Sequence, residues 1–192
     1  MNLIFASNNK HKIEEVQAII PTAFQLLSLK EAGIEIEIEE PYHTLEENAR
    51  EKAKVIYELV GKPCFSEDTG LEVFALNGDP GVHSARYAGD DRSFKKNIEK
   101  VLLKLNNNPN RSAQFRAVIC LYLDSNHYLF EGICTGDIIR EEKGIQGFGY
   151  DPIFIPKGAT KTFAEMTLKE KSQYSHRRKA VDKLVTFLNS LA

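Results

Sequence analysis

The sequence lacks the cysteine patterns that mark several classes of protein. Its 192 residues include three cysteines, Cys64, Cys120 and Cys134, and none of them stand at the paired spacing of a zinc or redox site. Their apolar, strand-like neighbours predict buried thiols, which are typical of a reducing compartment.

Long hydrophobic runs and targeting segments are also missing. The longest apolar run, Ala117 to Leu123, is too short to cross a bilayer. The opening residues, Met1 to Ala6, are too few for the apolar part of a secretory signal and have no basic lead. We therefore expect a cytoplasmic protein with no membrane partner.

Neither sign of charge is in large excess. A net charge of −2, with 27% charged and 42% hydrophobic residues, is ordinary globular composition and argues against a nucleic-acid partner. The distribution is uneven, because residues 31–51 hold eight Glu and one Arg while residues 157–183 hold eight Lys or Arg and three acids. These are either two solvated faces, or one segment that binds a cation and one that binds anions.

The stretch Ser66 to Leu71 is the central candidate for a functional site. Glu67 and Asp68 are adjacent carboxylates between two apolar, strand-like segments, and Gly70 permits a tight turn or the close approach of backbone to a bound group. Taken alone, the stretch is equally typical of an acidic turn and of a metal or ligand site.

The first residues predict a strand at 3–6, a polar turn at 7–12 and a helix that ends before Pro21. A helix start after a strand can hold phosphate through its N–H groups and a lysine. The Gly-Lys-Ser/Thr of a P-loop is absent, and the alternative is a plain N-cap by Ser7, Asn8 or Asn9.

Two further segments favour functional residues. Residues 34–39 alternate apolar and acidic side chains, which predicts a half-buried strand whose last glutamate, Glu39, could share a metal with Asp68. Residues 144–152 interleave three glycines with Phe148 and Tyr150, which suits a loop that stacks on a flat base. The alternative for that loop is a turn with two core aromatics.

The remaining pattern predicts alternating helices and strands. Thr44 and Glu47 form a capping-box pattern at the start of a helix that ends near Val60. The other predicted elements are strands at 24–29, 71–76, 112–124, 127–139 and 152–156 and helices at 93–105, partly at 162–171, and at 178–188.

Taken together, these stretches resemble the inosine/xanthosine triphosphate pyrophosphatase family, the Ham1-like group, over essentially the whole chain. Six motifs carry the resemblance in order: Ser7-Asn8-Asn9-Lys10-His11-Lys12, Glu47-Asn48-Ala49-Arg50-Glu51-Lys52-Ala53, Asp68-Thr69-Gly70-Leu71, Pro80 to Tyr87, Gly147 to Pro152, and Glu170-Lys171-Ser172 with Ser175-His176-Arg177. Two positions depart from the family pattern, since Asn8 replaces a commoner glycine and Glu67 stands where an aspartate is often found.

The resemblance implies one α/β domain over residues 1–192, with a mixed central sheet, flanking helices and two lobes around a deep cleft, as a homodimer. It implies hydrolysis of ITP, dITP and XTP to the monophosphate and pyrophosphate with Mg²⁺. The rival readings are a pyrophosphatase for modified pyrimidine nucleotides and a nucleotide-binding regulator without turnover.

The resemblance also implies roles for individual residues. Asp68 looks like the general base or metal-bound carboxylate, and Glu39 looks like a magnesium ligand. The residues that would bind substrate are Ser7, Asn8, Asn9, Lys10, His11, Lys12 and Thr69 at the triphosphate, and Phe148, Gly149, Tyr150, Asp151, Lys171, His176 and Arg177 at the purine.

Overall fold

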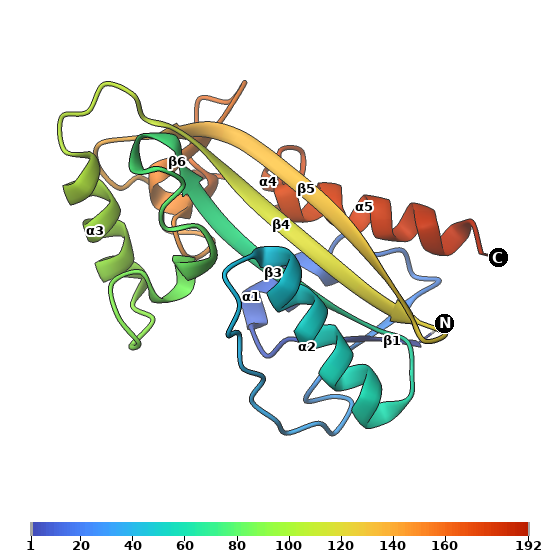
Figure 1. Cartoon of the computed structure of the whole chain (residues 1–192). Coiled ribbons are helices and arrows are strands. Elements are labelled where there is room, and N and C mark those ends of the chain that lie inside the picture. Colours follow the sequence, from blue (N-terminus) through green and yellow to red (C-terminus); the bar gives the residue numbers. More distant parts are fainter. Residues whose placement is uncertain (1, 192) are drawn as a thin grey trace. The chain divides into compact units, whose positions relative to one another are not determined.

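The computed structural model describes residues 2–191, and its six strands form one mixed sheet in the order β2-β1-β3-β4-β5-β6. The strands are β1 (Asn2–Phe5), β2 (Gln25–Ser28), β3 (Cys64–Val73), β4 (Ser112–Leu123), β5 (Asn126–Ile138) and β6 (Phe154–Pro156). β1 is parallel to β2 and β3, while β5 and β6 are antiparallel, which confirms the expected mixed sheet (Figure 1).

The helices flank this sheet. The α-helices are α1 (Lys10–Gln17), α2 (Leu45–Val60), α3 (Phe94–Leu105), α4 (Leu168–Ser172) and α5 (His176–Asn189). Short 3₁₀ turns lie between them: η1 (Phe74–Leu76), η2 (Gly81–Arg86), η3 (Asp151–Ile153) and η4 (Phe163–Glu165).

The chain divides into two compact units, which are described separately. Unit 1 comprises Met1–Asp68, Ala117–Gly132 and Arg177–Ala192, and unit 2 comprises Thr69–Arg116 and Ile133–His176. The prediction that residues 1–192 act as a single domain around a cleft stays a prediction.

Unit 1 buries both faces of its strands. Leu3 and Phe5 of β1 share one core with the apolar side of α5, whereas Ile4 and Ala6 face the other way and share a core with Ile56 of α2. Alternate side chains of a strand point to opposite faces, so β1 needs a helix on each side. Figure 1 shows α2 and α5 on different sides of these strands.

Unit 2 has one core around the end of β3. Leu71 and Val73 pack with the buried face of α3 and with a group of aromatic side chains; the aromatic members are Tyr87, Phe115, Tyr150, Phe154 and Phe163. A full turn separates Ile98, Val101 and Leu105 on α3, which is the spacing of one helix face.

Local sequence signals explain several element boundaries. Thr44 caps α2 by accepting from the backbone N–H of Glu47, as the capping-box pattern predicted, and Gly61 ends the helix in the left-handed conformation directly after Val60. Asp124 and Ser125 both have positive φ between β4 and β5, which is the geometry of a tight two-residue hairpin turn.

The predicted strand at 34–39 is wrong. The alternation itself is present, because Ile34 is buried while Glu35, Glu37 and Glu39 are exposed, but the segment lies outside the sheet. Its isoleucines pack into the core beneath α2, and alternate burial does not provide the neighbouring backbone that a strand requires.

Candidate functional site

The acidic pair of β3 is deeply buried in unit 1, where a lysine of α2 meets it. Lys52 donates to the Asp68 carboxylate (Nζ–Oδ1 3.4 Å), to the main-chain oxygen of Glu67 (3.0 Å) and to Glu40 Oε1. Lys52 reaches inward because it shares the buried face of α2 with Asn48, Ala49 and Ile56. Two carboxylates from distant segments therefore converge on one ammonium group.

Burial changes the proton affinities of this cluster. Desolvation raises the pKa of Asp68 above its ordinary value, although Lys52 and Lys12 counteract the effect. Desolvation lowers the pKa of Lys12 despite the nearby Glu67 carboxylate. For Lys52 the carboxylates of Asp68 and Glu40 outweigh desolvation, so its pKa is raised. A buried carboxylate with a raised pKa beside lysines is suited to accept a proton from water near neutral pH.

A second buried network extends from the same strand of unit 1. Arg177 donates from Nε and Nη2 to the two carboxylate oxygens of Glu67, both at 2.9 Å, and from Nη1 to Glu15. Its side chain is 1% exposed, and the two carboxylates outweigh desolvation to raise its pKa. The guanidinium fork thus holds Glu67 from one side.

Lys12 approaches Glu67 from α1. Its ammonium lies 3.4 Å from the main-chain oxygen of Glu67 and 3.8 Å from its carboxylate, with 15% of the side chain exposed. These are long contacts for a charged group, so Lys12 can turn toward a ligand at small cost.

The predicted phosphate-binding turn is an N-cap in this structure. The Asn9 side chain accepts from the N–H of Lys12 at 3.2 Å, and the Ser7 hydroxyl accepts from the N–H of Asn9 at 3.2 Å. Asn8, Lys10 and His11 are exposed. A capped helix start still has N–H groups that can bind an anion, so the N-cap is compatible with the predicted phosphate site.

The residues predicted at the purine lie in unit 2, except Arg177, which belongs to the unit 1 network. Lys171 donates to Asp151 (Nζ–Oδ2 2.6 Å), and the same oxygen accepts the N–H of Phe148 at 2.9 Å. The Lys171 ammonium also lies 5.3 Å from the centre of the Phe148 ring. The ion pair is buried, with side-chain exposures of 5% and 4%.

Glycine is required where this loop turns back on Asp151. Gly147 has φ +74°, and a Cβ atom there would overlap Asp151 Oδ2. Gly149 also has positive φ, at +62°. Asp151 therefore fixes the backbone of the loop that carries Phe148.

His176 and Thr69 complete the predicted set in unit 2. His176 is 3% exposed, and its ring stacks on Phe115 with 4.9 Å between centroids. Thr69 is half-buried. Asp68, Lys12 and Arg177 therefore lie in one cluster, Phe148, Asp151 and Lys171 form another, and His176 packs on Phe115.

Sequence reasoning missed the partners that hold these residues. No site role was assigned to four of these partners: Glu15, Glu40, Lys52 and Glu67. Glu39, which was predicted as a metal ligand, is exposed. Lys52 had a readable signal, because a lysine on the apolar face of a helix needs a buried partner. The pairing of Arg177 with Glu15 spans 162 positions, and nothing in the sequence links them.

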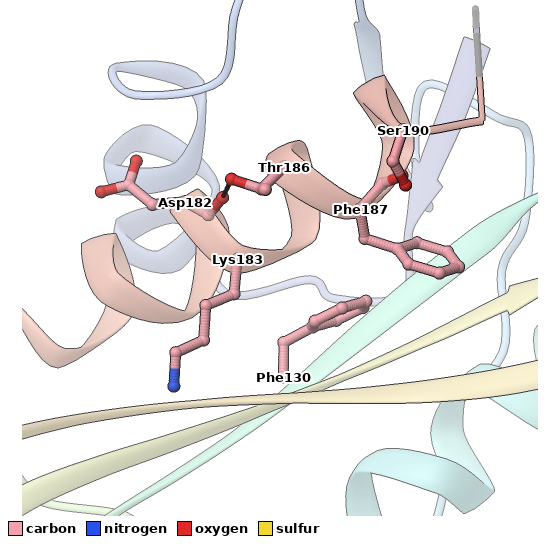
Figure 2. Close-up of a pocket in the computed structure, with 6 residues that line it drawn as sticks. All are labelled: Phe130, Asp182, Lys183, Thr186, Phe187 and Ser190. Carbon is pink, nitrogen blue, oxygen red and sulfur yellow. Dashed lines mark hydrogen bonds between the residues drawn. The ribbon is translucent and has the colours of Figure 1, made fainter.

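Among the described residues, no three His, Cys, Asp or Glu side chains gather in a metal-binding group. An open groove in unit 1 is lined by Phe130 of β5 and by residues of α5 and its C-terminal end: Asp182, Lys183, Thr186, Phe187 and Ser190 (Figure 2). It contains none of the predicted site residues. No helix within residues 2–191 is long and apolar enough to cross a membrane.

Comparison with known proteins covers nearly the whole chain. The sequence profile of the Ham1 family matches residues 3–187. A dITP/XTP pyrophosphatase of Flavobacterium psychrophilum is 48% identical over 190 residues, which are 99% of this chain and 100% of that protein.

Two solved structures share the fold. The Ham1 protein of Staphylococcus aureus matches with a TM-score of 0.90 and 40% identity, covering 100% of both chains. A HAM1 protein from Coxiella burnetii matches with a TM-score of 0.90 and 36% identity, covering 99% of both chains.

Proposed function

The chain belongs to the Ham1 family, and from that premise we propose that it hydrolyses deaminated purine nucleoside triphosphates, namely ITP, dITP and XTP. The products are the nucleoside monophosphate and pyrophosphate. The observation that carries the proposal is the buried Asp68 carboxylate, held by Lys52 beside Glu40, in a chain 48% identical to a dITP/XTP pyrophosphatase over its full length.

Asp68 is the proposed general base. Its raised pKa makes it a better proton acceptor than an exposed aspartate. The oxygen of a water molecule attacks the α-phosphorus while Asp68 takes a proton from that water. The bond from the α-phosphorus to the oxygen bridging to the β-phosphorus breaks, and pyrophosphate leaves with that oxygen.

The start of α1 is the proposed triphosphate site. Lys12 is the main donor, because its contacts with Glu67 are long enough to be exchanged for phosphate oxygens. The N–H groups and side chains at the helix start would contribute further contacts; these residues are Ser7, Asn8, Asn9, Lys10 and His11. Thr69 follows Asp68 on β3 and has a hydroxyl that can donate to phosphate.

Mg²⁺ is the proposed metal, and the donors present fit it. Glu40 and Asp68 supply hard oxygens that already share one cation, Lys52. Mg²⁺ in nucleotide sites is usually bound by one or two carboxylates together with substrate phosphates, so a group of three protein ligands is not required. When bound it would neutralise phosphate charge and make water more acidic. The geometry favours Glu40 over Glu39, whose role as a ligand stays a prediction.

The loop from Phe148 to Asp151 is the proposed base site. Phe148 offers an aromatic face for stacking, and Gly149 lets the backbone come close to it. His176 and Lys171 are buried donors that suit a 6-oxo group, whereas the 6-amino group of adenine would leave such donors unpaired. Arg177, which is committed to Glu67 and Glu15, acts in this proposal by holding Glu67.

We also propose a cytoplasmic homodimer that binds neither nucleic acid nor membrane. Cys64, Cys120 and Cys134 are buried and form no disulfide within residues 2–191, which supports a reducing compartment. Burial raises the pKa values of Cys64 and Cys120 to about 12, so both stay protonated and unreactive. The net charge of −2 gives no attraction to phosphate polymers.

Pyrophosphate release tests the proposal. ITP, XTP, dITP, GTP, ATP and dTTP are compared with magnesium and again with a chelator. We expect turnover of ITP, dITP and XTP, at least about a hundredfold slower turnover of ATP and dTTP, and loss of activity with the chelator. Equal turnover of all six contradicts the base assignment, and tight binding without turnover identifies a nucleotide-binding regulator.

A further inference from the structure

A buried serine in unit 2 is bonded to a strand, a helix and the proposed base loop. Ser84 lies in η2 and is 8% exposed. Its hydroxyl donates to the carbonyl of Gly81 (2.6 Å) and accepts the N–H of Leu71 on β3 (2.8 Å). Its hydroxyl proton and one lone pair are therefore both used inside the unit.

The main-chain carbonyl of Ser84 also makes two hydrogen bonds. It accepts from the hydroxyl of Tyr150 (2.8 Å) and from the Asn97 side chain of α3 (3.3 Å). Asn97 also donates to Ala85 and accepts from Ala88, so its amide clamps the residues that follow Ser84. A carbonyl oxygen has two acceptor sites, and both are occupied here.

Tyr150 brings the proposed base loop into this network. It stands between Phe148 and Asp151, is 4% exposed, and packs in the core of unit 2. Burial raises the pKa of its hydroxyl, so the group remains a neutral donor to Ser84. Tyr150 therefore anchors the loop to the core of unit 2.

The other end of the network lies beside the Thr69-Gly70 stretch of β3. Leu71, whose N–H is held by Ser84, directly follows Gly70. A Cβ atom at position 70 would overlap the carbonyl oxygen of Gly81, so this part of β3 and the turn before Ser84 are in close contact.

We propose that Ser84 is a positioning residue that fixes the Thr69–Leu71 part of β3 relative to the base loop Gly147–Asp151, through Leu71 on one side and Tyr150 on the other. This inference rests on the proposed function for its role in selecting the base. The geometry of a catalytic or binding site is sensitive to displacements smaller than about 1 Å. Because Ser84 is bonded to both the loop and the strand, it transmits the position of the loop to the strand.

Tyr150→Phe is the test variant, because it deletes one hydroxyl and keeps the ring. Tyr128→Phe is the control, since Tyr128 packs on Phe187 in unit 1. The first readout is hydrogen exchange of the full chain without nucleotide. We expect amide exchange at Leu71 to become about threefold to tenfold faster in Tyr150→Phe, although the deleted hydroxyl donates to Ser84 and not to Leu71, and to be unchanged in the control.

The second readout is kcat/KM for ITP and for ATP, well below the melting temperature. We expect kcat/KM for ITP to fall about threefold to tenfold, mainly through KM, and that for ATP to fall less, so that base selectivity decreases. Ser84→Ala should lower selectivity in the same direction, and Ser84→Ala combined with Tyr150→Phe should be no worse than about the more impaired single variant.

Each outcome decides a separate point. Faster exchange confined to the loop, with Leu71 unchanged, overturns the coupling. Faster exchange at Leu71 with unchanged selectivity overturns the positioning role and leaves Ser84 as a structural anchor. If Tyr150→Phe shows the exchange response and the wild-type chain does not hydrolyse ITP, the coupling stands and the proposed function fails.

Discussion

Unit 1 and unit 2 both bury polar side chains, but they do so with different chemistry. Unit 1 gathers three cations (Lys12, Lys52 and Arg177) and four carboxylates (Glu15, Glu40, Glu67 and Asp68) around the middle of β3. Unit 2 buries the ion pair of Lys171 with Asp151 among aromatic rings.

This difference shows how the proposed work is divided. The charged side chains of unit 1, with their altered pKa values, suit the binding of a metal and a triphosphate and the transfer of a proton. A neutral ion pair that fixes an aromatic loop suits a flat, uncharged base.

Asp68→Asn has the largest expected effect. It removes the proton acceptor while it keeps the shape and one acceptor oxygen, so kcat for ITP should fall about a thousandfold, within the usual range for a general base. Quench-flow or steady-state pyrophosphate release measures it. Asp182→Asn, an exposed aspartate on α5, is the matched control and should retain wild-type kcat. A fall of less than about tenfold in Asp68→Asn would remove Asp68 from the chemistry.

Arg177→Met tests the buried network of unit 1. It leaves Glu67 and Glu15 buried without their guanidinium, so the free energy of unfolding should fall by about 3–5 kcal/mol. Urea unfolding gives the value. The neighbouring Arg178→Met loses an exposed pair with Asp182 and should cost about 0.5 kcal/mol. Equal losses in the two variants would show that the Glu67 pairing does not stabilise unit 1.

Gly147→Ala tests the base loop of unit 2. The left-handed backbone costs an alanine about 1–2 kcal/mol, and its Cβ would also displace the Asp151 carboxylate. We expect KM for ITP to rise about tenfold with a small change in kcat. Gly158→Ala, at φ +89° with open space around the new Cβ, has the same backbone penalty and should leave KM unchanged. A matching rise in both variants would mean that the Asp151 contact is irrelevant to binding.

The pH dependence of kcat/KM gives the smallest and most specific effect. Because the pKa of Asp68 is raised, its protonated and inactive form persists to higher pH, and the acid limb should lie above 3.8. Because the pKa of Lys12 is lowered, the alkaline limb should lie below 10.5. Lys12→Arg should move only the alkaline limb upward. An acid limb at or below 3.8 would mean that Asp68 is not the titrating base.

Much of this fold could be predicted from local patterns. The capping box at Thr44, the left-handed Gly61 and the hairpin turn at Asp124 each depend on a few adjacent residues. The mixed sheet and flanking helices followed from the resemblance and are confirmed.

The site was harder to predict, because its residues are held by partners far away in the sequence. Arg177 was assigned to the purine from its motif, yet its guanidinium meets Glu67 across 110 positions and Glu15 across 162. Glu39 and not Glu40 was predicted as the metal ligand, because the strand predicted at 34–39 ends at Glu39. That strand is not formed, and Glu40 is the glutamate that turns inward. Spacing predicts which face a residue occupies and not which group it will meet.

The most direct test of the division is a comparison of two variants on two substrates. Glu40→Gln changes the charged cluster of unit 1, Phe148→Ala changes the aromatic loop of unit 2, and kcat/KM is measured for ITP and ATP. We predict that Glu40→Gln lowers both values by the same factor, so that their ratio stays within about twofold, while Phe148→Ala lowers the ratio about tenfold because stacking contributes about 1–3 kcal/mol. A ratio that changes in Glu40→Gln, or that holds in Phe148→Ala, would contradict the account.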